Sequence, residues 1–226
     1  MLVRRPVEAI IFDFDGVLAD SEVFHCAAFA AVAAAAGLPF SHTAYFNRFL
    51  GLPDRECFAA LCAEAKVACD PARLRALVAQ KRAAFARVAG DLTLYPGVET
   101  ALRRLHGHFL LAIASGAFRD EIEPLLMRAG VRGLFAAVIG AEDVQAGKPD
   151  PEPLARVLAV LNGCANRAIA PAACVVVEDA PLGVAAARAA GMQCIAVTTH
   201  HEPAALSAAD AIISSVAMLR REDLQA

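Results

Sequence analysis

Two aspartates separated by one residue, Asp13 and Asp15, follow a short apolar run and precede Gly16. The run, residues 10–12, has the length and composition of a buried strand in a parallel sheet. Ligands bind at the carboxyl edge of such sheets, and a chain that curls after the strand can turn both carboxylates toward one small ligand. This pattern suggests metal-assisted phosphoryl chemistry. Taken alone it fits a solvated acidic turn better, so residues elsewhere in the chain must decide.

Four further residues of suitable chemistry follow expected strands or lie in the loops just beyond them: Ser115, Lys148, Glu178 and Asp179. A hard cation such as Mg²⁺ prefers oxygen ligands. We expect Asp13, Asp179 and the main-chain carbonyl of Asp15 to supply them, with Glu178 acting through a water molecule. The sequence therefore predicts a magnesium site.

The remaining groups suit a phosphate. A transferring phosphoryl group spreads negative charge over its oxygens, and a lysine, a hydroxyl and main-chain N–H groups can offset that charge. We therefore expect Lys148, the hydroxyl of Ser115 and the amide of Gly116 to bind phosphate.

The elements that must position these residues alternate between strand and helix from residue 95 onward. Such alternation is typical of a parallel sheet covered by helices, and right-handed crossovers bring the strand ends to one edge. Strands are expected over residues 10–13, 109–114, 135–139, 174–177, 194–197 and 211–213. Helices are expected over residues 98–106, 119–129, 151–161 and 181–190. The predicted fold class is an α/β, Rossmann-like core.

The tract from Ser21 to about residue 90 has no alternating β-branched run and reads as a small helical bundle. Asp70 is a suitable N-cap and Pro71 a suitable first helical residue. Gly37 is a suitable helix end after the alanine-rich stretch. The expected helices cover residues 21–37, 41–48, 53–67 and 70–88.

Composition excludes several classes of protein. The chain of 226 residues is 58% hydrophobic, but much of this is alanine, and the alanine-rich run ends at Gly37, too short to span a bilayer. A formal net charge of −3 offers no basic field for nucleic acid or an anionic membrane. The N-terminus lacks the cleavage pattern of a signal peptide, so a cytoplasmic protein is expected.

The seven cysteines form no C-x-x-C pair. A zinc site at Cys57, Cys62 and Cys69 is an alternative, but the spacing fits no zinc pattern and no histidine lies among them. We interpret the cysteines as reduced thiols, mostly packed in the core.

With these motifs the chain resembles the haloacid dehalogenase superfamily, in the branch of β-phosphoglucomutase and small-molecule phosphatases. The resemblance spans essentially the whole chain. It rests on four motifs in order: residues 12–18, Ser115, residues 147–151, and residues 177–183 with 185–187 and 190–192. Each motif alone is weak, but four in this order and spacing are specific.

The resemblance implies that Asp13 attacks phosphorus to form an aspartyl-phosphate, and that Asp15 protonates the leaving oxygen and then assists water. It implies Mg²⁺ as cofactor and a small phosphorylated metabolite as substrate. It also implies a catalytic core of residues 1–20 and 91–226 and an inserted all-helical cap of residues 21–90. We expect a monomer.

Two alternatives to a phosphatase remain. One is a β-phosphoglucomutase-like mutase, but Leu50 stands before Gly51 where the mutase has a basic residue, which favours hydrolysis. The other is a non-catalytic binding module on the same fold.

Several side chains outside the motifs are possible substrate contacts. His25 matches a family histidine that faces the active site, and it fits a packed helix residue equally well. Four cations can reach a second anionic group, although most such residues are solvated: Arg48, Arg55, Lys81 and Arg82. The other histidines considered are interpreted as structural: His106, His108, His200 and His201.

Overall fold

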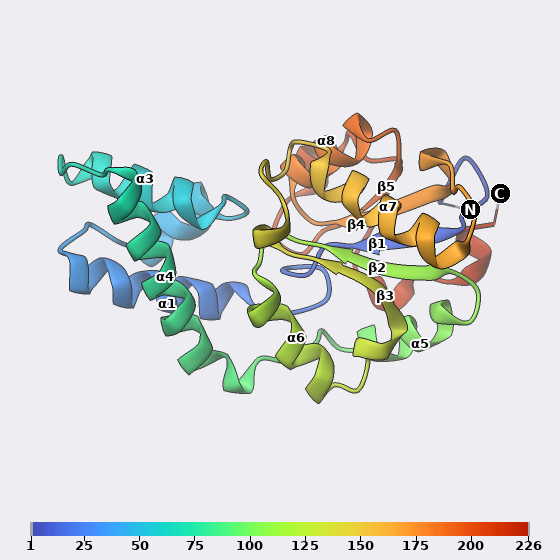
Figure 1. Ribbon diagram of the computed structural model, residues 1–226, viewed down its shortest axis with the longest axis horizontal. Helices are drawn as coiled ribbons and strands as arrows, with labels where there is room; N and C mark the ends of the chain where they lie inside the picture. The colour runs from blue at the N-terminus through green and yellow to red at the C-terminus, as the bar shows by residue number, and fades with distance from the viewer. Residues whose placement is uncertain (1, 226) are drawn as a thin grey trace. The chain divides into compact units, whose positions relative to one another are not determined.

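The computed structural model describes residues 2–225 and forms two compact units (Figure 1). The core unit combines the chain up to Asp20 with the chain from Thr93 onward. The helical unit is the segment Ser21–Leu92.

The core unit is built on one six-stranded, all-parallel sheet with the strand order β3-β2-β1-β4-β5-β6. The strands are β1 (Ala9–Phe12), β2 (Leu110–Ala114), β3 (Phe135–Ile139), β4 (Cys174–Glu178), β5 (Gln193–Val197) and β6 (Ala211–Ile213). The central strand β1 pairs with β2 on one side and β4 on the other, so that Phe12 lies beside Ile113 and Val177. The chain segments that follow these three strands therefore meet at the same edge.

Helices cover both faces of this sheet: α5 (Val98–His106), α6 (Arg119–Arg128), α7 (Glu152–Ala165) and α8 (Pro181–Ala189). Figure 1 shows α7 and α8 on one face and α5 and α6 on the other. Ile11 belongs to the apolar cluster formed with α7 and α8. Because side chains alternate along a strand, Ile10 and Phe12 point to the opposite face, where the Phe12 ring meets that of Phe135 edge-on. These findings confirm the predicted α/β, Rossmann-like fold class.

The helical unit contains α1 (Glu22–Ala36), α2 (His42–Ala44), α3 (Asp54–Glu64) and α4 (Pro71–Val88). Helix α1 ends at Gly37, whose φ of 66° places it in the left-handed region that glycine adopts readily. Helix α4 begins after Asp70, whose side chain accepts a hydrogen bond from the N–H of Arg73 at 2.8 Å.

The segment 41–48 differs from the expected helix. It has one α-helical turn, α2, followed by a π-helical turn over Tyr45–Phe49. Both Tyr45 and Phe49 are buried, and the Tyr45 hydroxyl donates a hydrogen bond to Glu22 Oε2 at 2.7 Å. The π-helical turn departs from the regular helical pitch and allows both rings to be buried. Burial of this kind depends on tertiary contacts and has no signal in the local sequence.

Two other helix ends also differ from expectation. Helix α3 stops at Glu64 rather than near residue 67, and Lys66 adopts a positive φ of 55° just beyond it. Helix α7 continues past residue 161 to Ala165 and is closed by Asn166 in the left-handed region, with a φ of 52°. Asparagine tolerates this conformation better than most residues, so it serves as a helix end in place of glycine.

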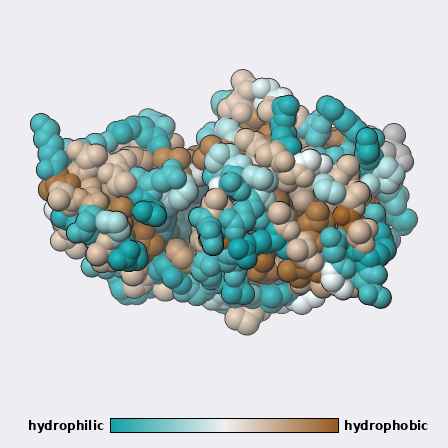
Figure 2. All heavy atoms as spheres, turned by 45° about the horizontal axis from the view of Figure 1, so that its top comes forward, coloured by the Kyte–Doolittle hydropathy of each residue, from teal (hydrophilic) through white to brown (hydrophobic). Residues whose placement is uncertain are grey.

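All seven cysteines are free thiols, and five of them are buried. Within residues 2–225, no helix combines the length and the apolar character needed to cross a membrane. On the face drawn in Figure 2, hydrophobic residues appear in small groups between hydrophilic ones.

Candidate active site

Asp13 directly follows the central strand β1, and its main chain is held by the neighbouring strand. The N–H of Asp13 donates to the carbonyl of Val177 at 2.9 Å. This bond continues the pairing of β1 with β4, so Asp13 lies beside Glu178, the last residue of β4. Parallel pairing alone thus brings together two carboxylates that are far apart in the sequence.

Lys148 comes to the same place from the loop between β3 and α7. Its Nζ lies 3.0 Å from Asp13 Oδ1 and also forms an ion pair and hydrogen bond with Glu178 Oε1. The side chains of Lys148 and Asp13 are each 13% exposed, and that of Glu178 is 1% exposed. The lysine therefore joins the ends of two adjacent strands in a mostly water-excluded position.

Glu178 and Asp179 occupy the turn between β4 and α8. Glu178 Oε2 accepts hydrogen bonds from the N–H groups of Asp179 at 3.0 Å and Ala180 at 3.2 Å. These N–H groups precede the first turn of α8, where the helix dipole also favours negative charge. The carboxylate of Glu178 is consequently fixed at both of its oxygens.

The carboxylates of Asp13, Glu178 and Asp179 form one group, with a ligand atom from each lying within 4.8 Å of the others. Burial raises the pKa of the Asp13 carboxyl well above its ordinary value, and Lys148 opposes this shift. The negative charges of Glu178, Asp15 and Asp179 raise the pKa of Asp13 further. The edge of the sheet therefore carries more negative charge than the single positive charge of Lys148 can offset.

Lys148 keeps its positive charge in this environment. Burial acts to lower its pKa, but the carboxylates of Asp13 and Glu178 outweigh burial and hold the pKa above its ordinary value. Lys148 is therefore a permanent cation at neutral pH, suited to contact an anionic oxygen.

The donor set fits a magnesium ion. It consists of carboxylate oxygens, which are hard ligands, and it carries surplus negative charge in a partly buried site. Asp13, Glu178 and Asp179 would hold the ion. Asp15, the fourth predicted ligand, interacts electrostatically with Asp13 but is not among the three grouped carboxylates.

Ser115 and Gly116 follow β2, the other neighbour of β1. Phe12 pairs with Ile113, so Ala114 is the residue beside Asp13, and Ser115 is the next residue in the chain. Ser115 is buried, and its Oγ accepts a hydrogen bond from the N–H of Ala117 at 3.1 Å. The hydroxyl of Ser115 can still donate its own hydrogen to another acceptor. Gly116 is exposed.

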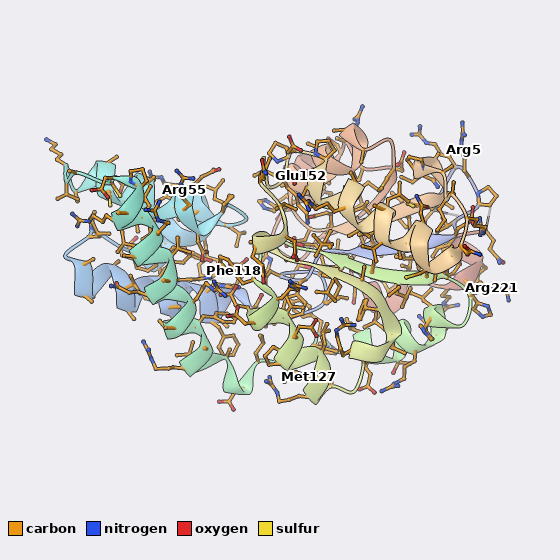
Figure 3. All side chains as sticks on the ribbon, in the orientation of Figure 1. Arg5, Arg55, Phe118, Met127, Glu152 and Arg221 are labelled. Atoms are coloured by element: carbon orange, nitrogen blue, oxygen red, sulfur yellow. The ribbon has the colours of Figure 1, made fainter. Side chains whose placement is uncertain are left out.

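The loop that carries Lys148 is anchored by a residue that sequence reasoning missed. Glu152, labelled in Figure 3 at the start of α7, accepts hydrogen bonds from the N–H groups of Gln145 at 3.1 Å and Ala146 at 2.9 Å. Those bonds and that of Arg156 lower the pKa of Glu152. Glu152 therefore acts as a fixed anionic acceptor for this loop, and only the folded geometry shows it.

His200 is a second residue whose position was not foreseen. It follows β5, and its Nδ1 lies 3.0 Å from Asp179 Oδ2. His200, interpreted from the sequence as a structural loop residue, thus contacts a predicted metal ligand. Spacing in the sequence gives no signal for this pair, since 21 residues separate the two side chains.

Three of the side chains considered in the helical unit have partners in that unit. His25 is buried and stacks on the Phe85 ring, with centroids 4.3 Å apart. Arg48 forms an ion pair with Glu64 at 2.6 Å, and Lys81 forms one with Asp54 at 3.0 Å. Arg55 is exposed, and Figure 3 labels it on α3.

Residues 7–191 match the model of the haloacid dehalogenase-like hydrolases. The chain belongs to this family, and it is a hydrolase by that membership. The predicted resemblance is confirmed.

Two relatives with curated functions cover most of the chain. The validoxylamine A 7′-phosphate phosphatase of Streptomyces hygroscopicus subsp. limoneus is 30% identical, over 93% of this chain and 94% of its own. The phosphorylated carbohydrates phosphatase of Thermotoga maritima is 31% identical, over 86% of each chain.

A solved structure has the same fold over nearly the whole length. It is CbbY from Rhodobacter sphaeroides in complex with xylulose-(1,5)bisphosphate, with a TM-score of 0.82 and 26% identity. The alignment covers 97% of this chain and 100% of that one.

Proposed function

We propose that this protein is a Mg²⁺-dependent phosphatase that hydrolyses a small phosphate monoester, such as a sugar phosphate, through an aspartyl-phosphate at Asp13. The observation that carries the proposal is the buried group at the sheet edge, in which Asp13, Glu178 and Asp179 meet Lys148. A nucleophile, an acidic metal site and a fixed cation are the parts that phosphoryl transfer requires.

Each residue has one part in the proposed reaction. Asp13 attacks phosphorus, and the P–O bond to the leaving oxygen breaks. Asp15 donates a proton to that oxygen and then removes one from the water that hydrolyses the aspartyl-phosphate. Lys148, Ser115 and the amide of Gly116 bind the phosphoryl oxygens. Bound Mg²⁺ supplies positive charge that reduces the repulsion between Asp13 and the phosphate.

The unit Ser21–Leu92 is proposed to serve as a cap. In this role it would contact the leaving group and exclude water during the first step. The names of the phosphatase relatives support a phosphorylated carbohydrate or a similar polyol as the substrate class.

Hydrolysis is favoured over a mutase reaction because of the charges in the helical unit. A mutase must hold the second phosphate of a bisphosphorylated intermediate, and a buried dianion needs paired cations. Leu50 is uncharged, and two of the four cations named for this role, Arg48 and Lys81, are already paired with Glu64 and Asp54. The exposed Arg55 is the cation that could compensate for Leu50. Water is therefore expected to reach the aspartyl-phosphate more readily than a sugar hydroxyl.

The test is to incubate the protein with β-glucose 1-phosphate, Mg²⁺ and a trace of the bisphosphate, while following glucose 6-phosphate and free phosphate together. A panel of sugar and polyol phosphates is assayed in parallel for phosphate release. Stoichiometric phosphate release from at least one substrate is the predicted result. Rapid isomerisation with little free phosphate would show that the protein is a mutase.

A further inference from the structure

Residues from two other loops lie against the side chain of Asp179 on two sides. On one side, His200 Nδ1 lies 3.0 Å from Asp179 Oδ2, and the two side chains are only 16% and 9% exposed. On the other side, the main chain of Gly16, with a φ of 74°, approaches so closely that a Cβ there would overlap the Asp179 carboxylate. Oδ2 is thus enclosed between a loop after β1 and a loop after β5.

The contact with His200 orients the carboxylate of Asp179. A carboxylate only accepts hydrogen bonds, so the imidazole must donate its Nδ1–H to Oδ2. This bond fixes the orientation of the carboxylate, and its oxygens keep further lone pairs with which to bind a cation. The main chain of Asp179 is fixed as well, because its N–H donates to Glu178 Oε2 at 3.0 Å.

We propose that His200 is a positioning residue for the metal site: it orients Asp179 so that one oxygen faces the cation before the cation arrives. The inference rests on the proposed magnesium site and adds to it a residue from the loop after β5. Partners that hydrogen-bond a ligating carboxylate are typically worth about ten- to a hundredfold in metal affinity.

The test measures cation binding directly, with Mn²⁺ as a paramagnetic probe and the free ion followed by electron paramagnetic resonance. His200→Ala should raise the Mn²⁺ dissociation constant by about tenfold or more. His200→Phe keeps a ring without a donor and should do the same. His200→Asn keeps an N–H donor and should restore binding to within a fewfold of wild type.

His201→Ala is the matched control, because it removes the adjacent, partly buried histidine that follows in the same loop. Its Mn²⁺ affinity should equal that of wild type. In an activity assay, the Mg²⁺ concentration for half-maximal rate should rise for the Ala and Phe variants, while the rate at saturating Mg²⁺ changes much less.

The outcomes separate this inference from the proposed function. If wild type binds no Mn²⁺, the proposed metal site is wrong and the inference falls with it. If wild type binds Mn²⁺ and His200→Phe binds it equally well, only the inference is overturned. Should His200→Ala fail to fold by circular dichroism, the Phe and Asn variants decide: equal affinities would refute the positioning role.

Discussion

At the scale of single residues, two glycines are as important for the site as its charged groups. Gly16 leaves the space occupied by the Asp179 carboxylate, and Gly183, in the first turn of α8, leaves the space occupied by Glu178. A Cβ built on Gly183 would overlap the carboxyl group of Glu178. The close approach of α8 to the end of β4 therefore depends on the absence of one methyl group.

Gly183→Ala should accordingly destabilise the protein by about 1–3 kcal/mol, the usual cost of overpacking, and should displace Glu178 from Lys148. Gly163→Ala is the matched control, because Gly163 lies in α7 with nothing within 4 Å of the added Cβ. That exposed helical substitution should be neutral or stabilise by about 0.5–1 kcal/mol. Chemical denaturation of both variants measures the difference, and equal effects would contradict the packing described for Glu178.

A site residue was predictable from the sequence where a chemically suitable residue type stands at the end of an apolar run. Asp13 and Glu178 lie at the ends of apolar runs, and parallel pairing of β1 with β4 brings those ends together. His200 and Glu152 were not predictable, because their roles depend on loop conformations that have no periodic pattern. The chemical roles of the site residues remain predictions.

At the scale of elements, the helical unit contains a buried charge that its packing must accommodate. Lys81 on α4 is 2% exposed in its side chain and lies 3.0 Å from Asp54 on α3, which is 19% exposed. The ammonium also lies about 5.5 Å from the ring centres of Phe29 and Phe85. An ion pair between α3 and α4 is thus combined with contact to two aromatic faces.

Asp54→Asn should destabilise the protein by about 3–5 kcal/mol, because it removes a negative charge from beside a buried ammonium. Lys81→Met keeps the apolar stem and removes the charge, and the charge it leaves unpaired, on the 19% exposed Asp54, is less buried than the ammonium left unpaired by Asp54→Asn. The Met variant should therefore lose less stability than the Asn variant. Thermal and urea unfolding compare the two, and the reverse order would show that the carboxylate does not balance the lysine.

Element types were predictable because apolar runs and helix caps agree with the tertiary structure. The expected strand 135–139 and helix 98–106 coincide with β3 and α5, and Asp70 caps α4 as expected. The segment after Ser41 was mispredicted because Tyr45 and Phe49 are placed by tertiary burial rather than by local propensity. Just beyond α3 and α7, Lys66 and Asn166 adopt the left-handed backbone conformation. Because neither is glycine, the sequence marks these two helix ends less clearly.

At the scale of the whole molecule, the proposed chemistry belongs to the edge of the core sheet. The fold class and the hydrolase family follow from the strand order and the family match. The proposed substrate class comes from the names of the phosphatase relatives and not from the strand order.

The most direct measurement of the central claim is phosphate release from an activated aryl phosphate and from sugar phosphates, by wild type and by Asp13→Asn, with Mg²⁺ and with excess EDTA. Wild type with Mg²⁺ should release phosphate, and chelation should abolish the activity. Asp13→Asn, which keeps the shape but not the nucleophile, should lose at least about a thousandfold in kcat. Full activity in EDTA, or substantial turnover by correctly folded Asp13→Asn, would contradict a metal-dependent reaction through Asp13.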